Sequence, residues 1–447
     1  MLIAPLLDLL GFARPAPVPM DGFVHPDFLP VATALRRQLA GYPGGAAVCV
    51  YHRGACVADL WGGFRDETGT PWRRDTMSPS FSTTKGVAST VLHVMVDRGL
   101  LDYDARVADY WPEFAQANKD GITVRHVLAH QSGLYHIRQM IDRADRMLDW
   151  EHMVRAIERA TPIHEPGART GYHGLTYGFL VGELVRRVTG KPFAQVVREA
   201  IAEPLGLDGM FVGTPPEQLP RAARLIWPER RLLVGGSGVM RLGGRELSET
   251  LELPASFLCR LLALVGIELD LASILDALAP RGINAFDFGA AATLQAAIPA
   301  ANGLFTARSL ARMYAALAGG GAVDGIRLLS TATLARATEV QRAPAGRSVI
   351  PFDMRWRLGY HGVLTTLGVP RHAFGHFGFG GSGAWADPGR DLAVALIVNS
   401  GMGMPFGDLR IVRIGGAALG AADARCQRDR LLAAAPLPAL PAPATPA

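Results

Sequence analysis

The stretch STTKGVASTVLHVMVDRG, residues 82–99, decides the fold of this chain. Its apolar side chains recur at the spacing of a helix face, at Val87, Val91, Leu92 and Met95. Gly99 stands where a helix C-cap is expected. The stretch therefore predicts a helix that begins at or beside Ser82.

Ser82 and Lys85 form an S-x-x-K pattern at the start of this helix. A serine at a helix N-terminus feels the positive end of the helix dipole, and its backbone N–H points outward. Lys85 follows one turn later on the same face, within reach of the serine hydroxyl. A lysine in a poorly hydrated pocket has a lowered pKa and can take a proton from serine. The pattern alone also fits a capping serine beside a surface lysine.

Two further segments carry residues suited to the same chemistry. Residues 164–174, HEPGARTGYHG, form a Pro/Gly-rich loop that delivers Tyr172 just before a helix. A nearby ammonium group favours the phenolate, so Tyr172 is a candidate to relay the serine proton to a leaving group. Residues 376–383, HFGFGGSG, are rich in glycines that let backbone N–H groups approach a ligand, as an oxyanion site requires. Because this segment leads into strands, its G-x-G-x-x-G spacing does not predict a dinucleotide site.

Strand patterns stand at both ends of the chain. Residues 45–62 alternate as a hairpin that turns at Arg53-Gly54, and residues 383–398 as a second hairpin that turns at Pro388-Gly389. The material between them reads mostly as helices and turns. This order predicts one sheet built from both ends of the chain, with a helical domain inserted between them.

Helical patterns in the middle and at the end of the chain complete this prediction. We expect helices at 124–130, 175–188 and about 407–421. The apolar run 257–265 is too short for a membrane span and reads as a buried helix or as a lid, with the buried helix favoured.

Taken in order, these segments resemble the serine β-lactamase superfamily, in particular the class C β-lactamase-like branch that includes the family VIII carboxylesterases. The resemblance covers roughly residues 20–420. It rests on six ordered blocks: STTK at 82–85, TVRHVLAHQSGL at 123–134, Pro166-Gly167 with Tyr172 and Tyr177, ANGL at 301–304, WRLGY at 356–360, and HFG at 376–378.

The resemblance implies an α+β fold of the class C β-lactamase and penicillin-binding-protein type, with an antiparallel sheet flanked by helices, an inserted all-helical domain, and the site between them. It makes Ser82 the acylated nucleophile and Lys85 and Tyr172 the general-base pair, leaving open which of the two is the immediate base. The oxyanion hole would be formed by the backbone N–H groups of Ser82 and Phe379. The expected division is an N-terminal segment 1–20, a discontinuous α/β domain 21–84 and 345–425, a mainly helical domain 85–344 that includes the unassigned insertion 224–285, and a disordered Pro/Ala-rich tail 426–447.

The chain departs from the class C pattern at two places. Gly174 stands where class C β-lactamases have an asparagine, and His376-Phe377-Gly378 replaces a Lys-Thr-Gly strand motif. A mostly neutral histidine binds a substrate carboxylate more weakly than a positively charged lysine does. Both changes make the site less polar, which favours uncharged acyl groups. We expect Gly174, His376 and Gly378 to contact such a substrate.

These observations favour a serine carboxylesterase that hydrolyses short- to medium-chain esters through a Ser82 acyl-enzyme, which water or another alcohol then resolves. A β-lactamase or D-amino-acid-specific peptidase on the same site is the first alternative. A catalytically inert scaffold with the same fold is the second, which intact Ser82, Lys85 and Tyr172 disfavour.

Composition excludes several other classes of protein. The net charge is only +5, from 45 basic and 40 acidic residues spread along the chain, so no nucleic-acid partner is expected. Four scattered cysteines indicate neither a disulfide framework nor a zinc ribbon, and Cys49 and Cys56 are expected close together as small buried side chains. His126 and His130 have the spacing of a zinc pair but no third ligand, so we expect no metal and no cofactor.

The first ten residues are apolar but too short to span a bilayer, and they lack the basic start and the cleavage site of a signal peptide. A cytoplasmic protein is expected, with peripheral membrane contact left open.

Overall fold

The computed structural model describes residues 18–227, 270–401 and 408–434. It also describes three short strands within the segment 228–269, namely β7 (Leu233–Val234), β8 (Met240–Leu242) and β9 (Arg245–Leu247). The apolar run 257–265, predicted to be a buried helix, lies outside the described residues.

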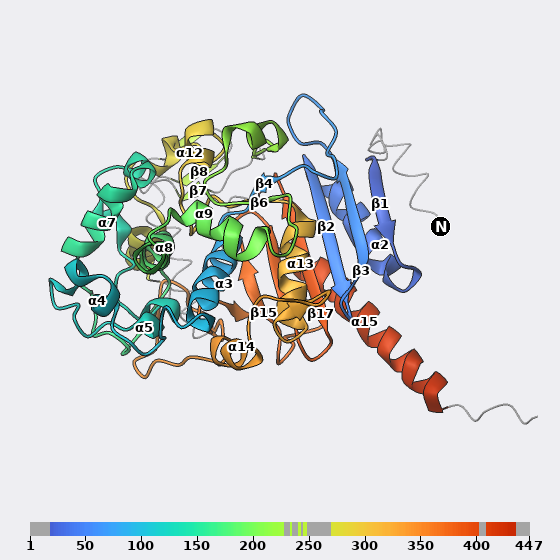
Figure 1. Ribbon diagram of the computed structural model, residues 1–447. Helices are drawn as coiled ribbons and strands as arrows, with labels where there is room; N and C mark the ends of the chain where they lie inside the picture. The colour runs from blue at the N-terminus through green and yellow to red at the C-terminus, as the bar shows by residue number, and fades with distance from the viewer. Residues whose placement is uncertain are drawn as a thin grey trace, which may run out of the picture.

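A seven-stranded antiparallel sheet forms one side of the molecule, on the right in Figure 1, in the order β1-β3-β2-β17-β16-β15-β14. Its strands are β1 (Met20–Val24), β2 (Gly45–His52), β3 (Ala55–Gly63), β14 (His361–Gly362), β15 (Phe374–Phe377), β16 (Gly383–Asp387) and β17 (Leu392–Val398). Val48 of β2 lies opposite Leu396 of β17, so strands from the two ends of the chain pair directly. Both predicted hairpins and the shared sheet are confirmed. Arg53 and Gly54 turn the first hairpin with positive φ angles of 55° and 73°, as a two-residue turn requires.

The predicted helix after Ser82 is α3 (Thr83–Asp97). Every residue from Thr83 to Val96 is buried, which places α3 in the interior. Gly99 ends it with a φ of 73°, and its N–H donates to the Val96 carbonyl at 2.9 Å. This helix contacts both β15 and the helical region, so it lies where the two parts of the fold meet.

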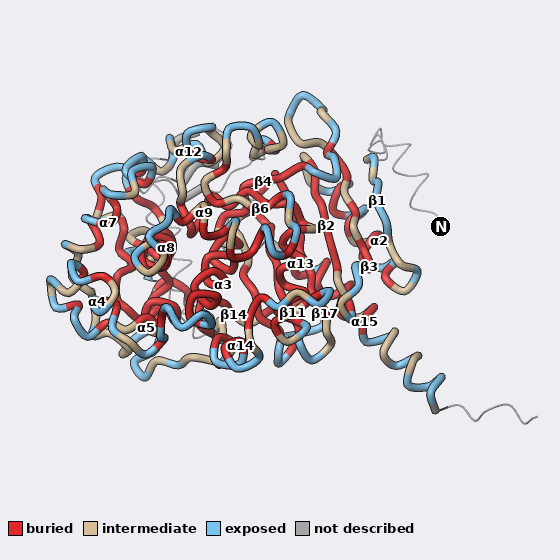
Figure 2. The backbone as a smooth tube through the Cα atoms, in the orientation of Figure 1, coloured by how far each residue is buried: buried red, intermediate tan, exposed pale blue. Residues whose placement is uncertain are grey.

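Helices cover both faces of the sheet. On one face α2 (Leu29–Gly41) packs with α15 (Arg410–Ala434), and on the other α13 (Ala307–Ala318) packs against β2, β16 and β17. Buried backbone is concentrated in the strands and in the helices at the centre of the molecule (Figure 2). Because α13 comes from the middle of the chain yet lies on the sheet, the sheet layer includes part of the range 85–344. The precise domain boundaries stay a prediction.

The remaining helices gather mainly at the other end of the molecule (Figure 1). They are α4 (Val107–Tyr110), α5 (Val124–Leu128), α6 (Ile137–Met140), α7 (Trp150–Arg159), α8 (Thr176–Thr189), α9 (Phe193–Val197), α11 (Leu271–Leu278), α12 (Ala291–Gln295) and α14 (Thr331–Ala337). The helix predicted at 175–188 is confirmed as α8. The helix predicted at 124–130 is two residues too long, because His130 has a φ of 58° and cannot continue it.

The predicted end of the C-terminal helix at residue 421 is wrong, since α15 runs to Ala434. Ion pairs bind residues 428 and 429 of α15 to the N-terminal part of the chain: Arg53 contacts Asp429 at 2.6 Å, and Arg428 contacts Asp27. Residues 426–434, assigned to the tail from sequence, are therefore helical.

The two cysteines of the first hairpin lie close together, with their Sγ atoms 3.8 Å apart. Cys49 is buried as expected, whereas Cys56 is exposed, so that half of the prediction is wrong. In the strand register Cys49 pairs with Asp59 and Cys56 pairs with Tyr51, and the register is irregular between Val50 and Tyr51.

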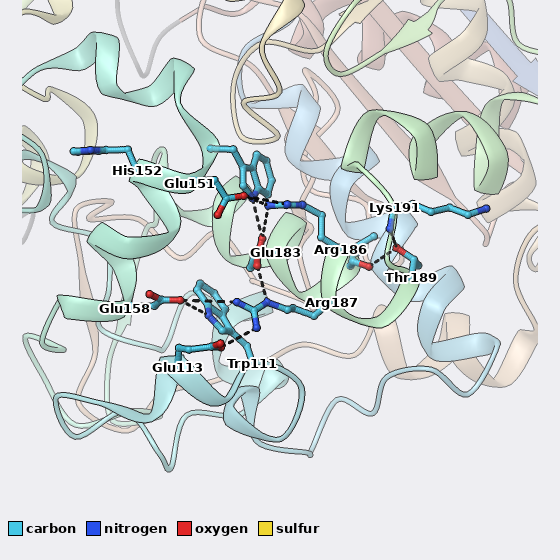
Figure 3. A network of polar contacts seen from close by, with 12 residues as sticks. Trp111, Glu113, Glu151, His152, Glu158, Glu183, Arg186, Arg187, Thr189 and Lys191 are labelled. Atoms are coloured by element: carbon cyan, nitrogen blue, oxygen red, sulfur yellow. Dashed lines mark hydrogen bonds and ion pairs between the residues drawn. The ribbon is translucent and has the colours of Figure 1, made fainter.

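A network of buried charge ties α7 to α8 (Figure 3). The Glu183 carboxylate is 5% exposed and accepts hydrogen bonds from Trp150 Nε1 at 2.8 Å, Arg186 at 3.0 Å and Arg187 at 2.7 Å. Arg186 also reaches Glu151, which is 59% exposed.

Glu183→Gln is expected to lower the free energy of unfolding by about 3 kcal/mol, because it removes the buried carboxylate that Arg186 and Arg187 share. The matched change Glu151→Gln should cost less than about 1 kcal/mol, because that ion pair is exposed. Urea denaturation of both variants checks this, and equal losses for the two would contradict it.

Candidate active site

The candidate nucleophile stands at a strained turn. β4 (Ser78–Pro79) leads into α3 through Phe81, which has a φ of 45°. A bulky side chain adopts this left-handed conformation only at an energetic cost, and such strain gathers at functional sites. The turn presents Ser82 at the N-terminus of α3, where the helix dipole favours negative charge.

Lys85 is fully buried, and its side-chain nitrogen has three partners. Nζ lies 3.0 Å from Ser82 Oγ, 2.6 Å from the Gly174 carbonyl oxygen and 2.9 Å from the Ala300 carbonyl oxygen. Burial lowers the pKa of Lys85 well below its usual value, as expected from sequence. No carboxylate is among its partners to restore the charge.

Tyr172 completes the group of three side chains. Its hydroxyl donates to Ser82 Oγ at 2.8 Å, and its ring lies 5.1 Å from Lys85 Nζ. The expectation that a nearby ammonium favours the phenolate is wrong, because burial raises the pKa of Tyr172 above its usual range. The physical reason is that Lys85, itself desolvated, favours its uncharged form and supplies little positive charge.

Two aromatic residues orient Tyr172, and sequence reasoning gave neither a role. Trp356 stacks on the Tyr172 ring at 5.5 Å with an interplanar angle of 18°. His130 lies 4.5 Å from the Trp356 ring, and its Nδ1 accepts the backbone N–H of His173 at 3.2 Å. Both residues fall in blocks that carry the family resemblance, but only the folded chain brings these blocks against Tyr172.

The glycine-rich segment 376–383 lies directly against the serine turn. A Cβ on Gly378 would come 2.3 Å from the Ser80 carbonyl oxygen, so only glycine allows this approach. The following residue, Phe379, packs its ring 5.5 Å from that of Phe81. The Gly378 N–H donates to the Ser382 carbonyl at 2.7 Å, while neither Ser82 nor Phe379 donates its N–H to another described backbone group. Their N–H groups thus remain available as the predicted oxyanion donors.

The two departures from the class C pattern have structural causes. A Cβ on Gly174 would lie 2.3 Å from Leu278 Cδ2 and 2.5 Å from the Ala277 carbonyl oxygen, so α11 fills the space of a larger side chain. His376 is 2% exposed, its Nδ1–H donates to the Phe377 carbonyl at 3.0 Å, and burial lowers its pKa well below the usual value. An uncharged His376 cannot replace a lysine as a fixed cation.

A cavity of about 720 Å³ opens at Ser82 and is lined mainly by apolar side chains. Ser82, Tyr172, Gly174, His376, Gly378 and Phe379 all line it. One wall comes from α11 through Ile274, Leu275 and Leu278. Its volume lies in the range typical of small-molecule sites.

Buried histidines at the site and elsewhere in the core make the fold sensitive to acid. Burial lowers the pKa of His93 and of His173 to about 3, and that of His361 to about 4. His93 shows why it stays neutral: its Nε2–H donates to the Leu358 carbonyl at 2.9 Å, and its Nδ1 accepts from Tyr103 at 2.8 Å.

The unfolded chain binds protons to these histidines below pH ~6.5, while the folded chain does not. Stability is therefore complete above that pH and is lost as pH falls, by about 2 kcal/mol for each such histidine at pH ~5. Urea denaturation between pH ~7.5 and ~5 checks this, and His93→Gln should reduce the loss. A free energy of unfolding that stays constant over this range would contradict it.

Among the residues that the structure describes, no group of three or more histidine, cysteine or acidic side chains has the arrangement of a metal site. His126 and His130 do not share a helix, so the spacing that suggested a zinc pair has no structural counterpart. In the described part of the chain, no helix has the length and apolar character needed to cross a membrane.

The Beta-lactamase family model matches residues 32–419 of the chain. The chain belongs to this family. The Esterase/beta-lactamase LipL of Mycobacterium tuberculosis is 38% identical over 381 residues, which cover 85% of this chain and 82% of LipL.

Solved structures of this family agree with the fold. A penicillin-binding protein homologue from Caulobacter crescentus has 33% identity and a TM-score of 0.75, covering 90% of this chain and 100% of that one. A family VIII carboxylesterase has 32% identity, the same TM-score and the same coverage. Together with the observed antiparallel sheet and helices, these likenesses confirm the predicted fold class and show that this member of the β-lactamase family is a serine hydrolase.

Proposed function

We propose that this protein is a carboxylesterase that hydrolyses short- to medium-chain esters through an acyl-enzyme on Ser82, and that an alcohol can replace water as acyl acceptor. The observation that carries the proposal is the set of three contacts made by Lys85 Nζ. A neutral amine has two N–H donors and one lone pair. The carbonyls of Gly174 and Ala300 take the two donors, which leaves the lone pair for the Ser82 hydroxyl.

The proton path follows from this arrangement. Ser82 donates its proton to Lys85 as its oxygen attacks the ester carbonyl, and the N–H groups of Ser82 and Phe379 stabilise the oxyanion. Tyr172, which donates to Ser82 Oγ at 2.8 Å and keeps its proton at neutral pH, passes it to the departing alkoxide and is reprotonated from Lys85. Water then attacks the acyl-enzyme by the reverse sequence and releases the acid. Lys85 is thus the immediate base and Tyr172 the proton donor.

The preference for an ester over a charged substrate is supported by the walls of the cavity. His376 supplies no cation for a carboxylate, and α11 leaves no room for a polar side chain at Gly174. The likeness to a family VIII carboxylesterase points in the same direction.

Hydrolysis of p-nitrophenyl acetate and butyrate by the wild type and by Ser82→Ala tests the proposal. The wild type should turn over both esters, and Ser82→Ala should not. An intact rate in Ser82→Ala would show that the serine assignment is wrong.

A β-lactamase activity of the same site is the second candidate, because the relative LipL carries both activities in its name. A cephalosporin and p-nitrophenyl butyrate should be compared by kcat/KM. A larger value for the cephalosporin would make the β-lactam the preferred substrate and overturn the ester preference.

A further inference from the structure

Large apolar side chains that face solvent edge the mouth of the catalytic cavity. Leu364, Val369 and Leu409 line the cavity and are nevertheless 49%, 51% and 45% exposed. Leu367, in the same loop between β14 and β15, is 61% exposed and does not line the cavity. We call these four side chains the apolar rim. Exposed apolar side chains gathered at one place mark an interaction surface.

The loop that carries the rim is anchored to the rest of the fold. The Thr366 N–H donates to the Val412 carbonyl of α15 at 3.3 Å. Within the loop, the Thr365 hydroxyl donates to the Gly368 carbonyl at 2.9 Å, and Gly368 turns the chain with a φ of 102°. The rim is therefore held outward by turn and helix contacts.

Basic side chains accompany the rim. Arg355 lines the cavity, and its guanidinium donates to the backbone carbonyl of Arg371 at 3.4 Å, which places the backbone of this exposed arginine at the same edge. Arg413 follows Val412, the residue that anchors the rim loop. None of the three arginines forms an ion pair with a described carboxylate. Among the described residues that line the cavity, the acidic ones are Asp353, which is exposed, and Asp408, whose side chain is 6% exposed and pairs with Arg410.

We propose that the apolar rim docks the protein on an anionic lipid–water surface, from which the site takes up apolar esters. This inference rests on the proposed esterase function. Apolar side chains flanked by arginines have the chemistry of an interfacial contact: the former enter the boundary between headgroups and acyl chains, and the latter meet the lipid phosphates. Because three of the four rim residues line the cavity, a molecule docked through the rim turns the cavity mouth toward the lipid, and an apolar ester reaches Ser82 without crossing water.

Co-sedimentation with phosphatidylcholine vesicles, prepared with and without phosphatidylglycerol, tests docking. The wild type should partition onto the anionic vesicles more strongly than onto the neutral ones. Leu367→Glu should lower partitioning onto the anionic vesicles by about tenfold, and Arg413→Gln by about fivefold.

Leu432→Glu is the matched control. Leu432 is 67% exposed and lies in the last turn of α15, and it is not among the residues that line the cavity. The C-terminal end of α15 projects from the body of the molecule (Figure 1). Its variant should partition as the wild type does. Docking is overturned if Leu367→Glu partitions like the wild type, or if only Leu432→Glu loses binding.

Kinetics separate the two proposals. Leu367→Glu should hydrolyse dissolved p-nitrophenyl butyrate at the wild-type rate and hydrolyse p-nitrophenyl decanoate, a medium-chain ester, held in anionic vesicles about tenfold more slowly than the wild type does. Vesicle binding without any ester hydrolysis would refute the esterase function and leave docking intact. Ester hydrolysis without vesicle binding would refute docking and leave the esterase function intact.

Light scattering tests whether the rim instead joins two copies of the chain. If Leu367→Glu changes the measured molar mass, and no vesicle binding is seen, the rim is a contact between two copies and docking on lipid is refuted.

Discussion

Lys85→Met is expected to lower kcat/KM for p-nitrophenyl butyrate by about 10³- to 10⁴-fold, because it removes the base that takes the Ser82 proton. Methionine keeps the length and apolar stem of the side chain but offers no lone pair of comparable basicity. The variant leaves the carbonyls of Gly174 and Ala300 without their donor, so each buried acceptor costs about 1–3 kcal/mol of stability. The rate is therefore divided by the concentration of folded protein, which is measured by circular dichroism.

The other two lysines of the chain provide controls. Lys191→Met removes an exposed lysine that pairs with Glu199, and should leave kcat/KM unchanged. Lys119→Met removes a buried lysine whose Nζ donates to three backbone carbonyls, and should lower stability without lowering the rate per folded molecule. A Lys85→Met rate within tenfold of the wild type would contradict the role of Lys85 as base.

The pH profile gives a second test of the same role. Since the pKa of Lys85 lies well below its usual value, kcat/KM should already be high at neutral pH and should fall only as acid protonates the amine. A wild-type rate that rises steadily up to pH ~10 would instead indicate a lysine of ordinary pKa.

Tyr172→Phe is expected to lower kcat/KM by about 10²- to 10³-fold, because the leaving alkoxide loses its proton donor. Phenylalanine preserves the stacking on Trp356, so the shape of the site is retained. The loss should be smaller for an ester whose leaving group needs no protonation, such as p-nitrophenol, than for a simple alkyl ester. Equal losses with both esters would argue against a role in leaving-group protonation.

Tyr177→Phe is the matched control for this variant. The Tyr177 hydroxyl is buried and bonded to Ser89 at 2.7 Å, away from the reacting groups. This change should cost about 1 kcal/mol of stability and leave the rate per folded molecule near that of the wild type.

Much of the fold follows from local sequence signals. The two hairpins carry both strand alternation and turn residues, and α3 carries helical periodicity closed by Gly99. The misjudged ends have tertiary causes. α15 extends beyond its predicted end at residue 421, because Asp27 and Arg53, which are distant in sequence, bind Arg428 and Asp429 of this helix. His130 leaves the helix because its φ of 58° aims its ring at Tyr172 and Trp356.

The candidate site likewise has one part that local sequence predicts and one part that depends on the folded chain. Ser82 and Lys85 lie one helical turn apart, so their proximity is a local property, and the structure brings them within 3.0 Å. The carbonyls of Gly174 and Ala300 carry no side-chain signature, so no motif could reveal that they share the lysine. The pKa of Tyr172 was misjudged because its direction depends on how completely both partners are buried, which is a property of the folded chain.

The most direct test of the central claim is the intact mass of enzyme quenched during the turnover of p-nitrophenyl butyrate, followed by peptide mapping. We predict a burst of p-nitrophenol and a single added butyryl group on Ser82, both absent from Ser82→Ala. Turnover without an adduct, or an adduct on another residue, would contradict catalysis through this serine.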